Sequence, residues 1–138
     1  MTAHYLFHMH KIVNIKWLRV LECFIVIALL VCISSVMTYP LLWHITSRMP
    51  GIGGDIPENS WTFWWFKYAL VNLHQNPFIT NFQFYPITIN ISDQISLFYN
   101  IVLLPASIFY GHIGSYNLRI FLSSILTGIG MYYFLFSL

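Results

Sequence analysis

Three long apolar stretches alternate with more polar segments along this chain. The first covers residues 20–44, the second residues 94–110 and the third residues 117–138. An α-helix rises about 1.5 Å per residue, so about 20 apolar residues cross a hydrocarbon core of about 30 Å. The pattern therefore predicts an all-α integral membrane protein with three transmembrane helices.

The segment before the first span indicates which side of the membrane it faces. Residues 1–19 carry Lys11, Lys16 and Arg19, and basic residues of this kind favour the cytoplasmic side. We therefore expect a cytoplasmic N-terminal tail over residues 1–19. The first apolar stretch is longer than the core of a cleaved signal peptide, which favours an uncleaved anchor in the inner (plasma) membrane.

This orientation fixes the expected sides of the two connections. The loop formed by residues 45–93 is predicted to be extracytoplasmic, and the short link 111–116 is predicted to be cytoplasmic. Arg119, which follows that link, agrees with a cytoplasmic position. The last apolar stretch runs to Leu138 without a polar cap, which predicts that the chain is the N-terminal portion of a longer polytopic protein.

Local residue chemistry predicts breaks and contacts in the second and third spans. Pro105 should kink the second span or unwind a turn, because proline lacks a backbone N–H. Gly111 should end that span. In the third span, Ser124 and Gly128 are four residues apart and form a small face. Such a face favours close packing of another helix over simple exposure to lipid.

Composition supports a membrane protein and argues against one class of partner. Only 7% of the residues are charged and 58% are hydrophobic, whereas about 25% of a soluble domain is charged. The net charge is +2, and the six basic residues are spread along the chain. They form no basic patch, so no nucleic-acid partner is expected.

The external loop contains a strongly aromatic segment. A helix over residues 58–74 would carry aromatic side chains around most of its circumference. Rings of this kind settle at the level of the lipid headgroups, so the segment predicts an interfacial helix. The aromatic residues in its first part are Trp61, Phe63, Trp64, Trp65, Phe66 and Tyr68.

The same loop holds three of the four acidic residues, namely Asp55, Glu58 and Asp93. Carboxylates beside a lipid surface are unfavourable unless they have a partner or a role. Two interpretations of Asp55 stay open. It is a water-facing acid that complements the start of a helix, or it is part of a functional site.

The order of several short motifs resembles a known family. It is similar to the N-terminal part of bacterial polytopic membrane proteins related to the GT-C glycosyltransferases, over about residues 38–133. The motifs that carry the resemblance are Thr38-Tyr39-Pro40-Leu41, Gly54-Asp55-x-x-Glu58-x-x-Trp61, Trp64-Trp65-Phe66-Lys67, Asn76-Pro77-Phe78-x-Thr80 and Tyr85-Pro86.

The resemblance implies roles for particular residues. Asp55 falls on the first-loop aspartate that acts as general base or helps to hold a metal in those enzymes, and Glu58 falls near their second acidic position. On chemical grounds, apart from the resemblance, Lys67 or Arg48 is a candidate to meet the phosphate of the donor, and Trp61 is a candidate substrate contact. Ile56-Pro57 separates acids that are adjacent in many family members, which leaves a divalent metal cofactor undecided.

The function expected from this resemblance is part of an inverting glycosyltransferase. It would take a sugar from a polyprenyl-phosphate donor outside the cytoplasm, with membrane lipid, the lipid-linked donor and further helices of the same protein as partners. Three spans are too few to enclose donor and acceptor, so the chain by itself is expected to be inactive. The alternative is a non-catalytic scaffold or assembly protein of the same ancestry. A scaffold would show no transfer but would co-purify with partner proteins.

Overall fold

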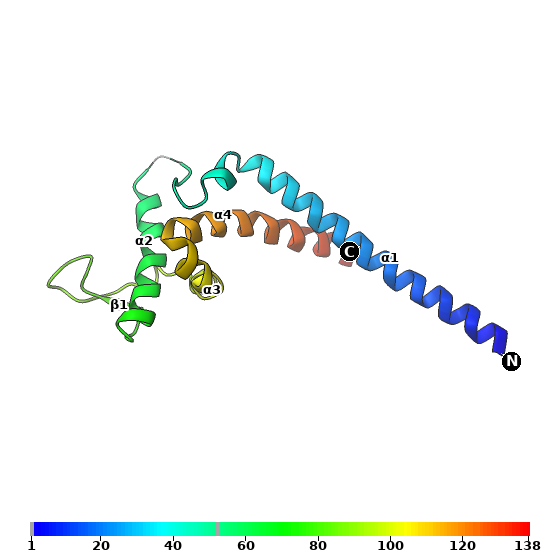
Figure 1. The fold of residues 1–138 in the computed structure, drawn as a ribbon. Coiled ribbons are helices and arrows are strands. Elements are labelled where there is room, and N and C mark those ends of the chain that lie inside the picture. The colour runs from blue at the N-terminus through cyan, green and yellow to red at the C-terminus, as the bar shows by residue number, and fades with distance from the viewer. Residues whose placement is uncertain (1, 52) are drawn as a thin grey trace. The chain divides into compact units, whose positions relative to one another are not determined.

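The computed structural model describes the backbone of residues 2–51 and 53–138, and the side chains of residues 17–51 and 53–138 (Figure 1). The side chains of residues 1–16 of the predicted basic tail, including Lys11 and Lys16, lie outside the described residues. The structure is mostly helical. Its elements in chain order are α1 (Thr2–Met37), the 3₁₀ helix η1 (Leu41–His44), α2 (Asp55–Lys67), the π-helix η2 (Tyr68–Asn72), β1 (Ile79–Thr80), β2 (Ile89–Asn90), α3 (Leu97–Val102) and α4 (Leu104–Ser137).

The chain forms two compact units. The helix-pair unit consists of α1 and residues 124–138, which include the C-terminal part of α4. The loop unit consists of residues 38–123.

Small residues hold the two helices of the helix-pair unit together. The Ser124 hydroxyl donates a hydrogen bond to the Ser34 hydroxyl over 3.1 Å. Gly128 faces Leu30 so closely that a Cβ on this glycine would lie 2.5 Å from Leu30 Cδ2. The predicted close approach of a helix to the small face of the last span is therefore confirmed, and the neighbour is α1.

A third contact shows how these helices run. The Tyr132 hydroxyl donates a hydrogen bond to Glu22 Oε1 over 2.8 Å. Residues later in α4 thus contact residues earlier in α1, so the two helices are antiparallel. The hydrogen bond also gives the Glu22 carboxylate a polar partner within a mostly apolar helix.

Two helices are long and apolar enough to cross a membrane, Trp17–Met37 within α1 and Leu104–Ser137. The first ends at Met37 and does not continue to residue 44 as predicted. Pro40 explains the end, because proline has no N–H for the helix and disfavours helical geometry in the preceding residue. Large apolar side chains of Trp17–Met37 are exposed, as a surface facing lipid requires.

The predicted second span, residues 94–110, is not one helix. The six residues of α3 end before Leu103, and α4 is interrupted at Gly111, which has φ 72° and ψ −177°. The helix α3 and the part of α4 before Gly111 are each about 10 Å long, far short of a hydrocarbon core of about 30 Å. The expected breaks near Pro105 and at Gly111 are confirmed, and the three-span arrangement is not.

The predicted cytoplasmic link 111–116 is helical and contacts the loop that was predicted to be external. Asn117 Nδ2 donates hydrogen bonds to the carbonyl oxygens of Ile45 and Arg48, both over 2.7 Å. A Cβ on Gly114 would lie 3.6 Å from Thr46 Cγ2. These segments belong to one unit, so a membrane between them does not fit the structure.

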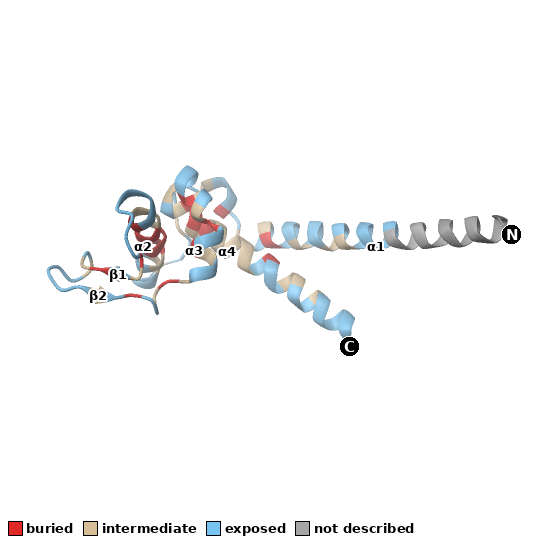
Figure 2. Cartoon of the chain, turned by 90° about the horizontal axis from the view of Figure 1, so that it is seen from below, coloured by how far each residue is buried: buried red, intermediate tan, exposed pale blue. Residues whose placement is uncertain are grey.

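The aromatic helix forms the core of the loop unit, and an interfacial position is not confirmed. A helix is present over α2 and η2, close to the predicted range 58–74. Figure 2 shows that its buried residues gather along α2. The core consists of Trp65, Phe66, Ala69, Ile91 and Ile95, with further apolar side chains packed against it. Residues after the helix fold back over these rings, so water and lipid are both excluded from them.

A short hairpin follows the helix. Strands β1 and β2 are antiparallel, with Ile79 opposite Asn90 and Thr80 opposite Ile89. The chain just before β1 is fixed to the core because Trp65 Nε1 donates a hydrogen bond to the Pro77 carbonyl over 2.8 Å. In Figures 1 and 2 the loop between the strands projects beyond α2.

Candidate functional site

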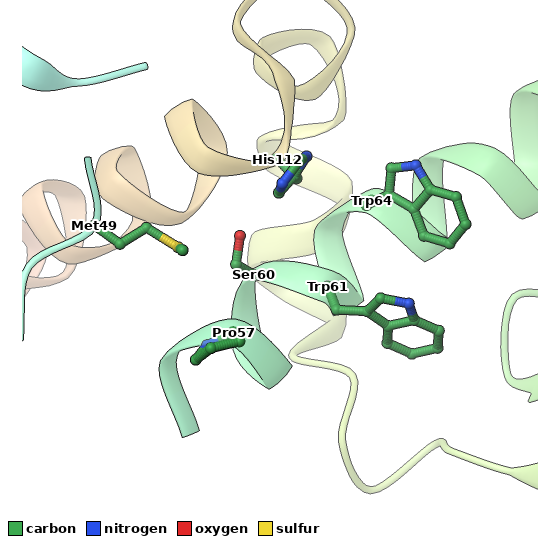
Figure 3. A pocket seen from close by; sticks show the side chains of 6 residues that line it. All are labelled: Met49, Pro57, Ser60, Trp61, Trp64 and His112. Carbon is green, nitrogen blue, oxygen red and sulfur yellow. The ribbon is translucent and has the colours of Figure 1, made fainter. Parts of the chain in front are cut away.

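One face of α2 lines an aromatic pocket with a volume of about 420 Å³ (Figure 3). Four of its lining residues, Pro57, Ser60, Trp61 and Trp64, have the spacing i, i+3, i+4 and i+7, which places them on one side of a helix. Met49 and His112 complete the lining. The predicted substrate contact Trp61 therefore lies in a cavity wall.

The two tryptophans that line this pocket stack on other aromatic rings of the same helical segment. The Trp61 ring stacks on Trp65 with a centroid distance of 5.9 Å and an interplanar angle of 2°. Trp64 stacks on Tyr68 at 5.1 Å and 10°. Stacked aromatic pairs add to the stability that burial provides, so the pocket has stiff apolar walls.

Two polar groups face this apolar space. Ser60 is only 2% exposed, and its hydroxyl has no hydrogen-bond partner among the residues that the structure describes. Figure 3 shows that this hydroxyl and the His112 ring point into the space between them. A buried hydroxyl without a partner is unfavourable, so Ser60 offers a hydrogen bond to a molecule that enters.

The predicted catalytic carboxylates lie elsewhere on α2. Asp55 and Glu58 are both exposed and occupy the first turn of the helix. At 3.6 residues per turn, Asp55 lies about 160° round the axis from Pro57, and Glu58 lies about 100° from it. Neither carboxylate belongs to the face that lines the pocket.

Arg119, for which the sequence predicts a cytoplasmic position, lies beside the first turn of α2. Arg119 on α4 donates a hydrogen bond from NH1 to Asn59 Oδ1 over 3.2 Å. The Asn59 amide nitrogen in turn donates to the backbone carbonyl of Asp55 over 2.7 Å. Asn59 lies about 40° from Asp55 round the helix, so the arginine and the aspartate share one side of α2.

The Arg119 guanidinium is also held by a ring, since its Cζ lies 5.5 Å from the centroid of Tyr99. Such contacts stabilise a cation by about 0.5–2 kcal/mol.

We call Asp55, Glu58, Asn59 and Arg119 the carboxylate–arginine cluster. The signal that could have found Arg119 is a charged residue within an apolar helix, which marks a functional position.

The two basic residues predicted to meet a phosphate are not in this cluster. Lys67 ends α2, twelve residues after Asp55, which is about 18 Å along the axis. Arg48 lines a separate pocket of about 180 Å³ with Thr38, Tyr39, Pro40 and neighbouring residues. The structure therefore separates Lys67 from the first turn of α2, and it places Arg119 against Asn59 beside that turn.

A metal is not supported by the geometry. Within residues 17–51 and 53–138, no three His, Cys, Asp or Glu side chains come together as ligands. Asp55 and Glu58 provide two carboxylates on the first turn, and a divalent cation usually needs more ligands than that from protein or substrate.

Comparison with known proteins leaves the family open: the chain matches no protein-family model, no curated protein and no solved structure.

Proposed function

We propose that this chain is part of an integral membrane glycosyltransferase that moves a sugar from a polyprenyl-phosphate donor to a hydroxyl acceptor. The observation that carries the proposal is the carboxylate–arginine cluster. It presents an exposed carboxylate and a positively charged guanidinium on one side of one helix. The antiparallel helices of the helix-pair unit support a site beside lipid, where a polyprenyl donor resides.

The reaction that suits these groups is an inverting displacement. The Asp55 carboxylate accepts the proton of the acceptor hydroxyl while its oxygen forms a bond to the anomeric carbon of the sugar. The bond from that carbon to the phosphate oxygen breaks, and the phosphate leaves with the electron pair. The Arg119 guanidinium stabilises the negative charge that develops on the leaving phosphate.

The aromatic pocket has a different task in this proposal. Its walls are mainly apolar, and it lies round the helix from Asp55. We assign it to the isoprenoid chain of the donor, which is long and flexible enough to reach from the cluster to the pocket. The Ser60 hydroxyl and His112 are the polar groups of this otherwise apolar lining.

The test is transfer from a polyprenyl-phosphate sugar in membranes that contain the natural protein. Asp55→Asn keeps the shape of the side chain and removes the base, so transfer should fall by about 10²- to 10⁴-fold at normal expression. Asp93→Asn is the matched control, because Asp93 is also exposed and lies outside the cluster. Glu58→Gln shows whether the second carboxylate shares the role. Equal transfer by Asp55→Asn and the unchanged protein would refute Asp55 as the base.

One observation favours the alternative of a non-catalytic scaffold. The carboxylates and the pocket face different sides of α2, whereas a compact active site would place them together. A scaffold would give no sugar transfer with the unchanged protein, and it would remain bound to partner proteins through purification. That result would exclude the transferase and retain the membrane attachment.

A further inference from the structure

The loop between β1 and β2 exposes large apolar side chains on a part of the protein outside the predicted spans. Its tip, residues 82–87, contains Phe84 at 60%, Tyr85 at 83% and Ile87 at 65% exposure. These residues are neighbours along one turn, so they form a single apolar tip. Three large side chains this exposed are unfavourable in water.

The tip is held in place by the rest of the loop unit. The Ile87 N–H donates to the Phe84 carbonyl over 2.7 Å and closes the turn. At its base, the Phe82 ring lies 5.1 Å from the Trp65 ring, and the Phe82 N–H donates to Thr80 Oγ1 over 3.1 Å. A loop fixed in this way loses little conformational freedom when a surface covers it.

The chemistry around the tip fits a lipid surface. From residue 68 to residue 92 the sequence contains no Asp, Glu, Lys or Arg. Charged side chains are the groups that a bilayer rejects most strongly. Aromatic rings such as those of Phe84 and Tyr85 are favoured at the boundary between headgroups and acyl chains.

The loop unit is joined at both ends to apolar helices that are long enough to cross a membrane. Residue 38, where the loop unit begins, directly follows the apolar helix Trp17–Met37, and residue 123, where it ends, lies within the apolar helix α4. A unit tied at both ends to spanning helices always has the bilayer within reach. A lipid surface is therefore a better occupant for the tip than a separate soluble protein.

We propose that residues 82–87 insert into the headgroup layer of the bilayer and anchor the loop unit against it. This interaction is independent of the proposed transfer reaction, because it needs neither the cluster nor the aromatic pocket. It would hold the loop unit close to lipid whether the protein is an enzyme or a scaffold.

The test uses the full chain in phosphatidylcholine–phosphatidylglycerol vesicles, with Cys23→Ser and Cys32→Ser to remove the native thiols. A nitroxide spin label is attached at Tyr85→Cys, and its relaxation is measured with oxygen, which concentrates in lipid, and with a water-soluble nickel chelate. Gln75→Cys is the control, since Gln75 is exposed in the same unit and outside the tip. Unchanged tryptophan fluorescence verifies that the core around Trp65 is intact.

Insertion predicts that the label at position 85 relaxes faster with oxygen and is protected from nickel, while position 75 remains open to nickel. Equal nickel access at both positions would overturn the proposal, because the tip would then lie in water. Protection of position 85 from both reagents would also overturn it, because a protein surface would then cover the tip.

Discussion

Adding one methyl group at Gly128 should weaken the pairing of α1 with α4. A Cβ at this position would lie 2.5 Å from Cδ2, 3.1 Å from Cδ1 and 3.3 Å from Cγ of Leu30. Three atoms of one side chain would be too close, so moving only the end of Leu30 does not relieve the contact. The helices must separate or Leu30 must leave its rotamer.

Gly130→Ala is the matched control for this change. Gly130 lies two residues later in α4, and among the described residues no atom lies within 4 Å of a Cβ placed there. Both substitutions replace glycine by alanine in a helix, which favours the helix by about 1 kcal/mol. This gain cancels when the two variants are compared. The remaining difference is the steric term at Gly128, for which overpacking gives about 1–3 kcal/mol.

Disulfide formation between Ser34→Cys and Ser124→Cys reports this pairing, because the two native hydroxyl oxygens are 3.1 Å apart. A difference of 1–3 kcal/mol lowers the equilibrium constant for pairing about 5- to 150-fold. The measurement uses a protein without the native cysteines, in a detergent in which α1 and α4 separate part of the time. Gly128→Ala should then slow the formation of the disulfide, and Gly130→Ala should not. Restoration by Leu30→Ala would identify the contact. Identical cross-linking in the two alanine variants would refute the reasoning.

Two further predictions concern the loop unit. Asn117→Asp directs a carboxylate at the carbonyl oxygens of Ile45 and Arg48, so thermal unfolding followed by tryptophan fluorescence should show a loss of about 3–5 kcal/mol. Asn117→Leu should lower the free energy of unfolding by only about 1–2 kcal/mol. The loss is smaller because this substitution also removes the buried Oδ1 atom, which lacks a partner within the described part of the chain. Equal losses in the two variants would contradict this account. Thiol reagents that cannot cross the membrane should label Gln75→Cys and His112→Cys from the same face, and labelling from opposite faces would restore the three-span arrangement.

Local features of the fold could be predicted because their causes are local. Long apolar runs, the breaks near Pro105 and at Gly111, and the small face of Ser124 and Gly128 depend on residues close together in sequence. The environment of the aromatic helix, which is a protein core and was predicted to be a headgroup layer, could not be predicted from local sequence. A ring-rich helix suits a headgroup layer or a protein core, and the choice depends on whether a distant segment such as the one at Ile91 folds over it.

In the candidate site, too, local features could be predicted from the sequence and contacts between distant residues could not. The position of Asp55 at a helix start follows from nearby sequence, and the structure places it in the first turn of α2. The approach of Arg119 to Asn59 joins residues sixty positions apart, and no local pattern encodes that distance. Lys67 and Arg48 are candidates on their charge alone, and the structure places Lys67 at the end of α2 and Arg48 in the lining of a separate pocket.

The number of membrane crossings depends on whether residues 94–110 form a spanning helix. A third span would separate the link 111–116 from the loop 45–93, yet Asn117 is bonded to the backbone at Ile45 and Arg48. With these segments on one side, the candidate crossings that remain are Trp17–Met37 in α1 and the later part of α4, and their contacts show that the two helices are antiparallel. The residues between them, 38–123, form the loop unit, where Arg119 donates a hydrogen bond to Asn59 on α2.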